Sequence, residues 1–493
     1  MIKNPLIIIG GGIGGLAAGC YAQMNGYQSK IFEMHTLPGG FCTAWKRKGY
    51  TFDYCIHDLA GAGANSSLHH VWQELGALEE TPLIHFDEFW RVENMDGKPL
   101  MGYCDIDHLE LHLLAHSPQD SRLITQYLRG IKNFQKFELF SIQEGGAEAY
   151  LNTLAHLSTL VRWSSVNMGS FARRFKDPFL REAFPYFQYG AFDTPLSVHM
   201  NFVANVANQK FAWPSGGSLE FAKRIAARYE ALGGEIHYKS KVEEVLVEED
   251  RAVGVRLADG SYHNADRVIS TADGMYTIYT MLNGMYTNRF IDEYYKNPPD
   301  DSTMSLIVSL GVRREMKDEP RAITLLLDEP LYIGDRMRQT LDIEILAYEP
   351  EFSPPGCTSI RVLMDTAYAP WARSYQDHEK YETDKQVVAE DVISVLEKRF
   401  PGIREQVEVI DVATPVTVER YTGNYRGHNA WLPKKDALRL MVSGISRTLP
   451  GLNNFYMAGQ WASMAVGLHS TAISGRKLIQ RLCKEDERQF TIE

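Results

Sequence analysis

The chain has 493 residues, of which 44% are hydrophobic and 23% are charged, a composition typical of globular proteins. A chain of this length is too long for a single hydrophobic core, so we expect two or three substructures. The formal net charge of −11 argues against binding to nucleic acid, which requires a basic surface.

The sequence carries no signal for export or for a membrane span. Its first apolar run, residues 6–9, is short and leads directly into a glycine cluster, unlike a signal peptide. No run of about 18 apolar residues occurs. The six cysteines lack the spacing of metal ligands, and they are Cys20, Cys42, Cys55, Cys104, Cys357 and Cys483. We therefore predict reduced thiols, no metal site and a cytoplasmic location.

Residues 6–33 predict a dinucleotide site. An apolar strand, Leu6–Ile9, precedes a glycine-rich turn and a helix of small residues, and a second strand, Ser29–Phe32, ends at Glu33. Glycines at the spacing G-x-G-x-x-G allow a tight turn, close approach to a pyrophosphate and close helix packing. The helix N-terminus stabilises the phosphates, and the acid accepts a ribose hydroxyl. The residues predicted to line this part of the site are Gly10, Gly12, Ile13, Gly14, Gly15, Glu33 and Met34.

A second glycine pair favours FAD over NAD. Glu33 fits either dinucleotide, but Gly39 and Gly40 follow it closely and lead into Phe41 and Cys42. This spacing gives the backbone a second approach to phosphates and a ring system, as in flavoproteins of the glutathione-reductase-like class. The alternative is an ordinary turn. A second G-x-G-x-x-G after a strand is missing, so we do not expect a dedicated nicotinamide domain.

Residues 233–272 predict further strands of the cofactor domain. A helix end leads into a strand near Val242, then into a hairpin with its turn at Asp259–Gly260, and then into a last buried strand. In FAD folds the backbone of the strand near Val242 passes the adenine. Val242 fits an ordinary core position equally well.

The C-terminal region predicts a third cofactor segment. A strand, Phe455–Ala458, ends at Gly459 and Gln460. A loop containing Gly467, Leu468 and His469 then precedes a helix expected from about residue 471 to 484, with Ser470 as its N-cap. The start of this helix suits the negative charge at the N1–C2=O edge of a reduced flavin. Gln460 is either a hydrogen-bond partner of a ribitol or phosphate oxygen or a polar loop residue.

We therefore predict an α/β protein: a glutathione-reductase-like FAD-binding Rossmann domain with an inserted α+β substrate domain. The FAD-binding domain is expected to be discontinuous, over residues 1–68, 205–275 and 411–493. The substrate side is expected over residues 69–204, which are helical in pattern, and 276–410, which mix strands with an amphipathic helix, Asp384–Arg399.

These motifs together resemble the carotenoid desaturase superfamily, which includes phytoene desaturases, carotenoid isomerases and retinol saturases. The resemblance implies a non-covalent FAD, a hydrophobic tunnel, and redox or isomerisation chemistry at carbon–carbon double bonds of a polyene or isoprenoid. It places the flavin beside residues 55–59 and beneath 467–469. The sequence departs from the family at Cys55, where many members have glycine, and in lacking an arginine after Gly40. The matching text is GGGIGGLAAG, PGGF, GYTFDYCIHDLAG, WPSGGS, ATPVTVERYTG and LPGLNNFYMAGQWASMAVGLHSTAISGR.

Two histidines are candidate catalytic residues. A saturase needs a proton donor, and His57 suits that role at neutral pH, with Asp58 as a residue that orients it. The alternative for His57 is a hydrogen bond to backbone near the cofactor. His469 is interpreted as a contact to the flavin edge. The alternative is that it acts as an acid. The direction of reaction, the substrate and the electron partner (quinone, oxygen or NAD(P)H) stay open.

Two other functions share this architecture. A flavin amine oxidase usually lines its flavin with an aromatic pair, which residues 460–469 supply only in part. An isoprenoid-binding escort protein, such as the Rab escort and dissociation-inhibitor proteins, binds lipid without redox chemistry. Those proteins lack a working flavin site, whereas this chain keeps the glycines and the acid of one.

Residues 170–191 combine aromatic with basic side chains, a pattern with which a protein can contact a lipid surface. This predicts a peripheral membrane contact. The alternative is that the aromatic side chains belong to the core and that the charges form a solvated face.

Overall fold

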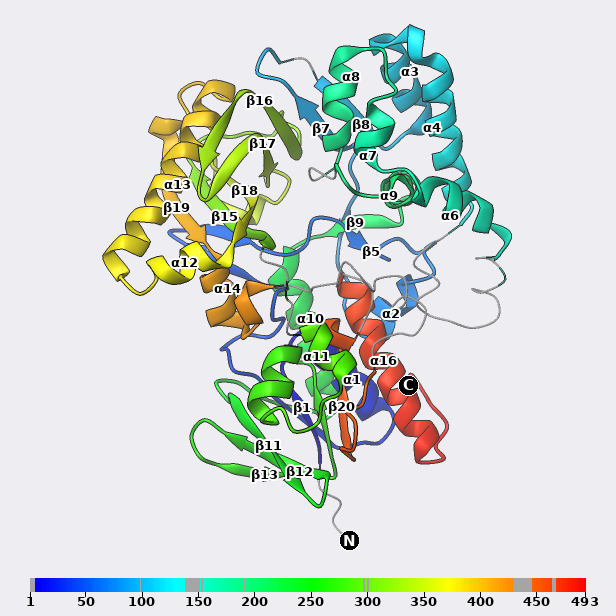
Figure 1. The fold of residues 1–493 in the computed structure, drawn as a ribbon, viewed down its shortest axis with the longest axis vertical. Helices are drawn as coiled ribbons and strands as arrows, with labels where there is room; N and C mark the ends of the chain where they lie inside the picture. Colours follow the sequence, from blue (N-terminus) through cyan, green and yellow to red (C-terminus); the bar gives the residue numbers. More distant parts are fainter. Residues whose placement is uncertain are drawn as a thin grey trace.

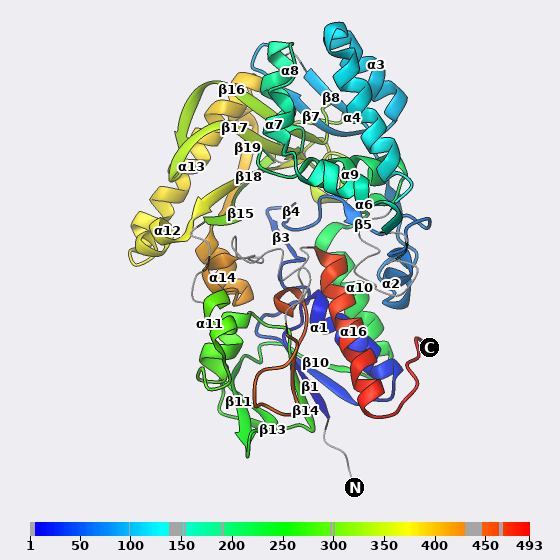
Figure 2. The ribbon, with the colours of Figure 1, turned by 45° about the vertical axis from the view of Figure 1, so that its right-hand side comes forward.

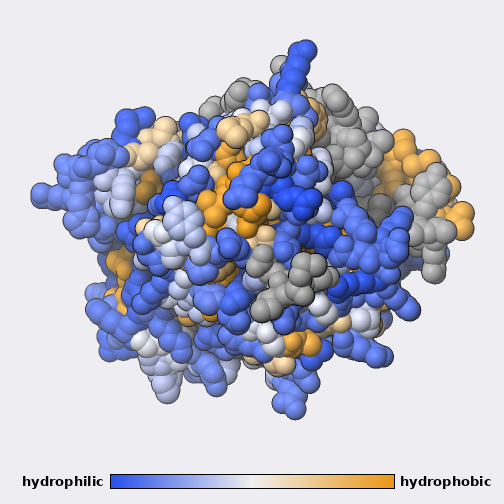
Figure 3. Space-filling model, turned by 90° about the horizontal axis from the view of Figure 1, so that it is seen from below, coloured by the Kyte–Doolittle hydropathy of each residue, from blue (hydrophilic) through white to orange (hydrophobic). Residues whose placement is uncertain are grey.

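The computed structural model describes residues 5–97, 99–137, 151, 154–188, 192–295, 298, 301–428, 446–462 and 467–493. Figure 1 shows three regions: a lower region that contains both termini, an upper left region built on a large sheet, and an upper right region of helices. Seen from below, the surface of the lower region is mostly hydrophilic, with apolar residues in separate patches (Figure 3). Within the described part of the chain, no helix has the length and apolar character needed to cross a bilayer.

The lower region contains a five-stranded parallel sheet in the order β10-β2-β1-β14-β20. Its central strand β1 is fully buried and consists of leucine and isoleucine, as expected for a parallel sheet covered on both faces. This sheet confirms the predicted α/β class. Its strands are β1 (Leu6–Ile9), β2 (Ser29–Phe32), β10 (Glu235–His237), β14 (Arg267–Ser270) and β20 (Phe455–Met457).

Three helices pack together beside this sheet: α1 (Ile13–Met24), α10 (Gly217–Ala231) and α16 (Leu468–Glu485) (Figure 2). The small residues of α1 permit this close packing. A Cβ on Gly15 would lie 1.9 Å from the carbonyl oxygen of Gly10, and one on Gly14 would lie 2.7 Å from the Cα of Gly459. Gly14 and Gly15 therefore fix the spacing of backbone segments.

A three-stranded antiparallel sheet follows the predicted hairpin. It comprises β11 (Val242–Glu248), β12 (Arg251–Leu257) and β13 (Tyr262–Asn264), and the last two strands flank the predicted turn at Asp259–Gly260. Two small sheets link this lower region to the upper ones. One is the hairpin of β3 (Ala44–Arg47) and β4 (Tyr50–Asp53), and in the other β9 (Phe211–Pro214) lies between β5 (Leu59–Ala60) and β6 (Leu83–Ile84).

The upper left region contains a seven-stranded mixed sheet in the order β19-β15-β18-β17-β16-β7-β8. Helix α13 (His378–Arg399) packs against it through an apolar face that includes Val388, Val392 and Leu396. This helix begins six residues before the predicted Asp384, because Asp377 caps it by accepting a hydrogen bond from the Lys380 N–H. The strands are β7 (Glu88–Glu93), β8 (Pro99–Tyr103), β15 (Asp301–Val312), β16 (Ala322–Ile333), β17 (Arg336–Ile345), β18 (Thr358–Ala367) and β19 (Val407–Ala413).

The remaining helices are mostly short. They are α2 (His69–Glu74), α3 (Ile106–His116), α4 (Ser121–Phe134), α6 (Leu157–Ser164), α7 (Met168–Ala172), α8 (Pro178–Ala183), α9 (Leu196–Ala207), α11 (Arg289–Tyr295), α12 (Tyr368–Ser374) and α14 (Pro415–Thr422). Short helical turns are η1 (Pro118–Asp120), η3 (Phe184–Tyr186), η4 (Tyr276–Met281), η5 (Pro350–Phe352), η6 (Arg404–Gln406), η7 (Tyr425–Gly427) and η8 (Gln460–Ala462).

The strands of the two large sheets can be compared with the predicted domain segments. The five-stranded sheet takes strands from all three predicted segments of the FAD-binding domain. The seven-stranded sheet takes β7 and β8 from the first predicted substrate segment and four strands from the second. The boundary predicted at residue 410 falls inside β19, which pairs with β15 throughout. The division into two domains as a whole stays a prediction.

The aromatic side chains of residues 170–188 lie in the helical core. Phe171, Phe175, Phe184 and Phe187 are almost completely buried, and the basic side chains between them are exposed. Their burial agrees with the alternative that these aromatic side chains belong to the core, because two short capped helices turn them inward. A peripheral membrane contact of this region stays a prediction. Residues 189–191 lie outside the described residues.

A partly buried acid on β17, Asp342, makes stability depend on pH. Asp342 accepts a hydrogen bond from Thr324 Oγ1 at 2.6 Å, and burial raises the pKa of this carboxyl to about 7. In the unfolded chain an aspartate titrates near pH 4, so between about pH 4 and 7 the folded state holds the extra proton. The stability that Asp342 contributes is fully present below about pH 4 and is lost as the pH rises through about 7.

We expect Asp342→Asn to remove this dependence. Relative to the wild type, the variant gains on the order of 1 kcal/mol of unfolding free energy per pH unit between about pH 5 and 7. Urea unfolding at several pH values measures the difference. Glu329→Gln changes an exposed acid on β16 that is not among the charges acting on Asp342, and this control should follow the wild-type curve. A wild-type curve parallel to that of Asp342→Asn would contradict the assignment.

Candidate active site

A cavity of about 1140 Å³ lies where the lower and upper regions meet. It brings together most of the residues predicted for the cofactor, although the three segments are far apart in the sequence. Gly15 and Gly459 do not line it and act through packing. The predicted residues that line the cavity are Gly10, Gly12, Ile13, Gly14, Glu33, Met34, Gly39, Gly40, Phe41, Cys42, His57, Val242, Gln460, Gly467, Leu468 and His469.

The N-terminus of α1 fits a pyrophosphate. Gly12 is the N-cap of this helix and has no side chain that could cap the N–H groups of the first turn. No acidic residue lies in that turn. A Cβ on Gly12 would meet only the Gly39 carbonyl oxygen, at 3.9 Å, so the space beside it is open cavity. Gly39 donates its N–H to the Gly11 carbonyl at 2.9 Å, which holds the second glycine turn against the first. Free N–H groups at a helix start bind phosphate oxygens.

Glu33 lines the same cavity. Its carboxylate accepts hydrogen bonds from the N–H groups of Gly11 at 2.6 Å and His35 at 2.7 Å. Burial raises the pKa of this carboxyl, and the two N–H donors oppose the rise. The acid therefore fixes the glycine turn and also presents its carboxylate to the cavity. Val242, the first residue of β11, is buried and lines the cavity nearby.

The His57 imidazole lies against two buried charged side chains from the seven-stranded sheet. Its Nδ1 is 2.6 Å from Glu344 Oε1, on β17, and 2.8 Å from Arg361 Nη2, on β18. The ring itself is 20% exposed, whereas the glutamate side chain is 5% exposed and the arginine side chain 1%. Burial raises the pKa of Glu344, but Arg361 and His57 outweigh it, and the net shift is strongly downward.

Arg361 binds the loop that carries His57. Its Nη1 donates to the Asp53 carbonyl oxygen at 2.9 Å, and its Nη2 donates to the Ile56 carbonyl oxygen at 2.7 Å. It also pairs with the Asp53 carboxylate at 3.2 Å and the Glu344 carboxylate at 2.5 Å. One buried guanidinium thus holds both the backbone and the acids of this site.

The Asp53 carboxylate connects the same loop to α10. It accepts hydrogen bonds from the Ser218 N–H at 2.6 Å and the Ser218 hydroxyl at 2.7 Å. The Ser218 hydroxyl oxygen in turn accepts from the Ile56 N–H at 2.8 Å. Burial raises the pKa of Asp53, while Arg361 and Ser218 lower it. The FD and SGGS motifs of the sequence therefore meet at one hydrogen-bonded corner of the cavity.

Asp58 does not orient the His57 ring, contrary to the sequence-based hypothesis. Its carboxylate pairs with Arg321 at 2.6 Å, and Arg321 also donates to the His57 carbonyl oxygen at 3.1 Å. The orienting acid is Glu344 instead. Glu344 and Arg361 were missed because neither belongs to a recognisable motif and both lie far from His57 in the sequence.

The helix near His469 begins earlier than predicted. Gly467 is the N-cap of α16, which spans Leu468–Glu485. Ser470 therefore lies inside the helix, and the prediction that it is the N-cap is wrong. Gly467 has φ 126°, which favours glycine, and a Cβ there would lie 2.9 Å from the His469 ring. Thr471 donates to Gln460 Oε1 at 3.2 Å. Residues 463–466, part of the predicted aromatic pair region, lie outside the described residues.

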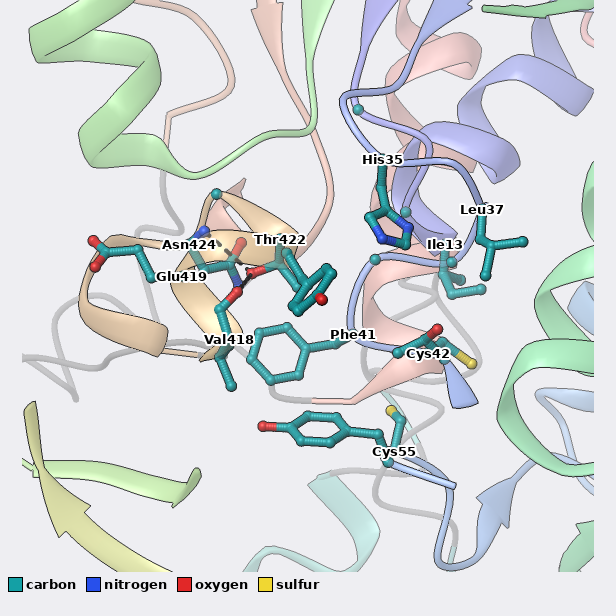
Figure 4. Close-up of a pocket in the computed structure, with 18 of the residues that line it drawn as sticks. Ile13, His35, Leu37, Phe41, Cys42, Cys55, Val418, Glu419, Thr422 and Asn424 are labelled. Carbon is teal, nitrogen blue, oxygen red and sulfur yellow. Dashed lines mark hydrogen bonds between the residues drawn. The ribbon is translucent and has the colours of Figure 1, made fainter. Parts of the chain in front are cut away.

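Apolar side chains around Phe41 form one wall of the cavity. Figure 4 shows Phe41 beside Val418, with Cys42 and Cys55 close together on the opposite side of the ring from Asn424. Phe41 lies 5.5 Å from Tyr54, measured between ring centroids. The motif ATPVTVERYTG, which contains α14, contributed to the family resemblance, but the sequence predicted no role for this helix. Thr414 forms a capping box there, and the helix presents Val416, Val418 and Thr422 to the cavity.

A family model described as flavin containing amine oxidoreductase matches residues 13–481. The chain therefore belongs to the flavin containing amine oxidoreductase family. This membership implies FAD, and the glycine cradle, the open space beside Gly12 and the acid at Glu33 fit that cofactor.

Relatives within this family include carotenoid enzymes. The chain is 24% identical to a chloroplastic prolycopene isomerase of an Oncidium hybrid cultivar, over 97% of this chain and 84% of the relative. It is 26% identical to a lycopene-forming phytoene desaturase of Pseudescherichia vulneris, over 83% of this chain and 85% of the relative. The predicted resemblance to the carotenoid desaturase superfamily is thereby confirmed.

Solved structures of other oxidoreductases share the fold. An oxidoreductase from Methanosarcina mazei superimposes with a TM-score of 0.61 at 16% identity, over 97% of this chain and 100% of that chain. A putrescine oxidase variant gives a TM-score of 0.62 at 15% identity, over 98% of this chain and 99% of that chain. These similarities establish the FAD-binding α/β fold of the family.

Two glycine substitutions should separate folding from cofactor binding. In Gly15→Ala the Cβ meets a carbonyl oxygen at 1.9 Å, so we expect a loss on the order of 3 kcal/mol in the unfolding free energy of the apoprotein. In Gly12→Ala the methyl group enters open cavity, and the backbone at φ −69° accepts alanine.

Gly12→Ala should therefore melt like the wild type without cofactor but bind FAD at least about 10-fold more weakly, because the methyl group occupies the pyrophosphate approach. Thermal melts of apoprotein and titration with FAD measure the two effects. Equal FAD affinity in Gly12→Ala and the wild type would contradict the placement of the pyrophosphate.

Proposed function

We propose that this flavin oxidoreductase acts on a carbon–carbon double bond of an apolar polyene or isoprenoid, by desaturation, saturation or isomerisation. The activities for which its carotenoid relatives are named, prolycopene isomerisation and phytoene desaturation, support this reaction class. The apolar wall of Phe41, Tyr54 and Val418 supports an apolar substrate.

One observation carries the proposal: His57 lines the same cavity as the glycine cradle and the apolar wall. FAD, when bound, supplies a hydride acceptor or donor. The residues of this chain supply the rest. The α1 N-terminus binds the pyrophosphate, and Glu33 accepts hydrogen bonds from ribose hydroxyls. The apolar wall excludes water from the substrate. His57 exchanges a proton with the substrate carbon.

The alternatives make different predictions for purified protein. An escort-like isoprenoid carrier needs no flavin, whereas the open cradle at Gly12 supports flavin binding. A flavin amine oxidase would reduce its flavin with an amine rather than with a polyene. Colour and the identity of the reductant therefore distinguish the three functions.

Anaerobic mixing tests the proposal directly. FAD-loaded protein is mixed separately with phytoene, prolycopene, putrescine and NADPH, and flavin absorbance is followed. Bleaching by phytoene alone indicates desaturation, and bleaching by NADPH followed by polyene-driven reoxidation indicates saturation. Product analysis of the prolycopene reaction detects isomerisation. Bleaching by putrescine without any response to the polyenes would contradict the proposal.

We expect His57→Gln to lower turnover by about 100-fold or more while FAD stays bound, because a positioned acid or base contributes rate and little cofactor affinity. Flavin absorbance of the purified variant and polyene turnover measure the two quantities. His108→Gln, on the exposed face of α3, is the matched control and should keep wild-type turnover. Unchanged turnover in His57→Gln would remove His57 as the proton-transferring residue.

A further inference from the structure

Glu344 divides its carboxylate between two partners. Oε1 lies 2.6 Å from His57 Nδ1, and Oε2 accepts a hydrogen bond from Arg361 Nε at 2.5 Å. A glutamate needed only to neutralise Arg361 would have no reason to place its second oxygen on the imidazole. The geometry therefore points to a function directed at His57.

The contacts at Nδ1 define where the ring carries its proton. A carboxylate only accepts hydrogen bonds, and a guanidinium only donates them, so Nδ1 cannot satisfy both neighbours. The pKa of Glu344 lies well below its usual range, because the charges of Arg361 and His57 outweigh the burial that raises it. An ionised carboxylate at 2.6 Å requires a proton on Nδ1. The Arg361 guanidinium then lies beside the ring as a charge and not as a hydrogen-bond donor to it.

Charged groups from several elements surround this ring. The acids are Asp53 from β4, Asp58 from the following loop, and Glu344 from β17. The bases are Arg361 from β18 and Arg321, which precedes β16. Asp58 and Arg321 pair with each other, and Asp53 is satisfied by Ser218 and Arg361. Glu344 is the acid whose carboxylate contacts the imidazole.

We infer that Glu344 is a positioning residue that keeps the proton of neutral His57 on Nδ1, so that Nε2 is the nitrogen that exchanges a proton with the substrate. Arg361 supports this arrangement by binding Glu344 and the loop carbonyls on either side. The inference rests on the proposed function and names the residue that makes His57 competent in it.

The proton balance of the reaction follows. In the saturating direction the π bond of the substrate breaks; one carbon receives a hydride from reduced FAD and the other receives the proton of Nε2. The imidazole is left neutral with its proton on Nδ1, and solvent restores the second proton. In the desaturating direction two C–H bonds would break and the π bond would form: Nε2 would accept the proton, and bound oxidised FAD would supply the hydride acceptor.

Nitrogen NMR of FAD-loaded protein labelled with ¹⁵N-histidine tests the inference without any substrate. The His57 signals are those that disappear in His57→Gln. At a pH where the ring is neutral, we expect a directly bonded proton on Nδ1 and none on Nε2. A proton on Nε2 in the wild type would overturn the inference, whatever the reaction proves to be.

Glu344→Gln is the decisive variant, and Asp342→Asn is its matched control. Both change an acid on β17 to the amide of the same shape, but Asp342 accepts a hydrogen bond from Thr324 and does not line the cavity. An amide at Glu344 can turn its NH₂ group toward Nδ1, which moves the ring proton to Nε2. We expect this change of tautomer in Glu344→Gln and the wild-type tautomer in Asp342→Asn.

Kinetics give a second readout. With phytoene or prolycopene, kcat should fall by about 10- to 100-fold in Glu344→Gln with less than about a 3-fold change in KM, because binding is kept and proton transfer is lost. Asp342→Asn should keep wild-type kcat. An unchanged tautomer and kcat in folded, flavin-loaded Glu344→Gln would overturn the inference. If that variant fails to bind flavin, the position of the His57 ring proton in the wild type decides whether the inference holds. Inactivity of wild-type protein with every polyene would instead contradict the proposed function and leave the tautomer result standing.

Discussion

The buried guanidinium of Arg361 connects the cofactor side of this molecule to its substrate side. It extends from β18 of the seven-stranded sheet and binds two carbonyl oxygens and two carboxylates around residues 53–57 and Glu344. A buried charge that loses its partners is strongly destabilising, by about 3–5 kcal/mol. The loop therefore has one favourable arrangement against the sheet. The position of His57, the corner formed by Ser218 and the width of the cavity all depend on that arrangement.

The opposite wall of the cavity consists of closely packed backbone, because the glycines that form it have no side chains. Gly14 and Gly15 bring α1 against Gly459 and β1, and Gly12 leaves open space at the start of the helix. One wall is thus fixed by close backbone packing and the other by a network of charges. Phosphate recognition needs the first, since N–H groups must reach the ligand. Proton transfer needs the second, since a histidine is useful only in a defined tautomer and orientation.

The sequence allowed prediction where the determinants are local. Gly10, Gly12 and Glu33 lie within one βαβ unit, so strand, turn, helix and acid could be recognised together. Helix ends were less certain: Gly467, not Ser470, caps α16, because a glycine at positive φ allows the chain to enter the helix directly. The aromatic residues near Phe171 fit either a lipid-facing or a core helix by pattern, and only the packing of the neighbouring helices decides. Glu344 and Arg361 lie on strands with no motif, and long-range strand pairing alone brings them to His57.

The order of strands in the five-stranded sheet has a consequence for biosynthesis. Its edge strand β20 and the Gly459 contact of α1 come from the last tenth of the chain, whereas β1 and β2 are made first. At about 5–20 residues per second, β1 and β2 wait on the order of a minute for the segment that completes their sheet. During that interval strand β14 lacks its edge partner β20, and the small-residue face of α1 lacks Gly459 and α16. The nascent chain must therefore be shielded from association with other chains until synthesis is almost finished, and flavin capture becomes the final step of its maturation.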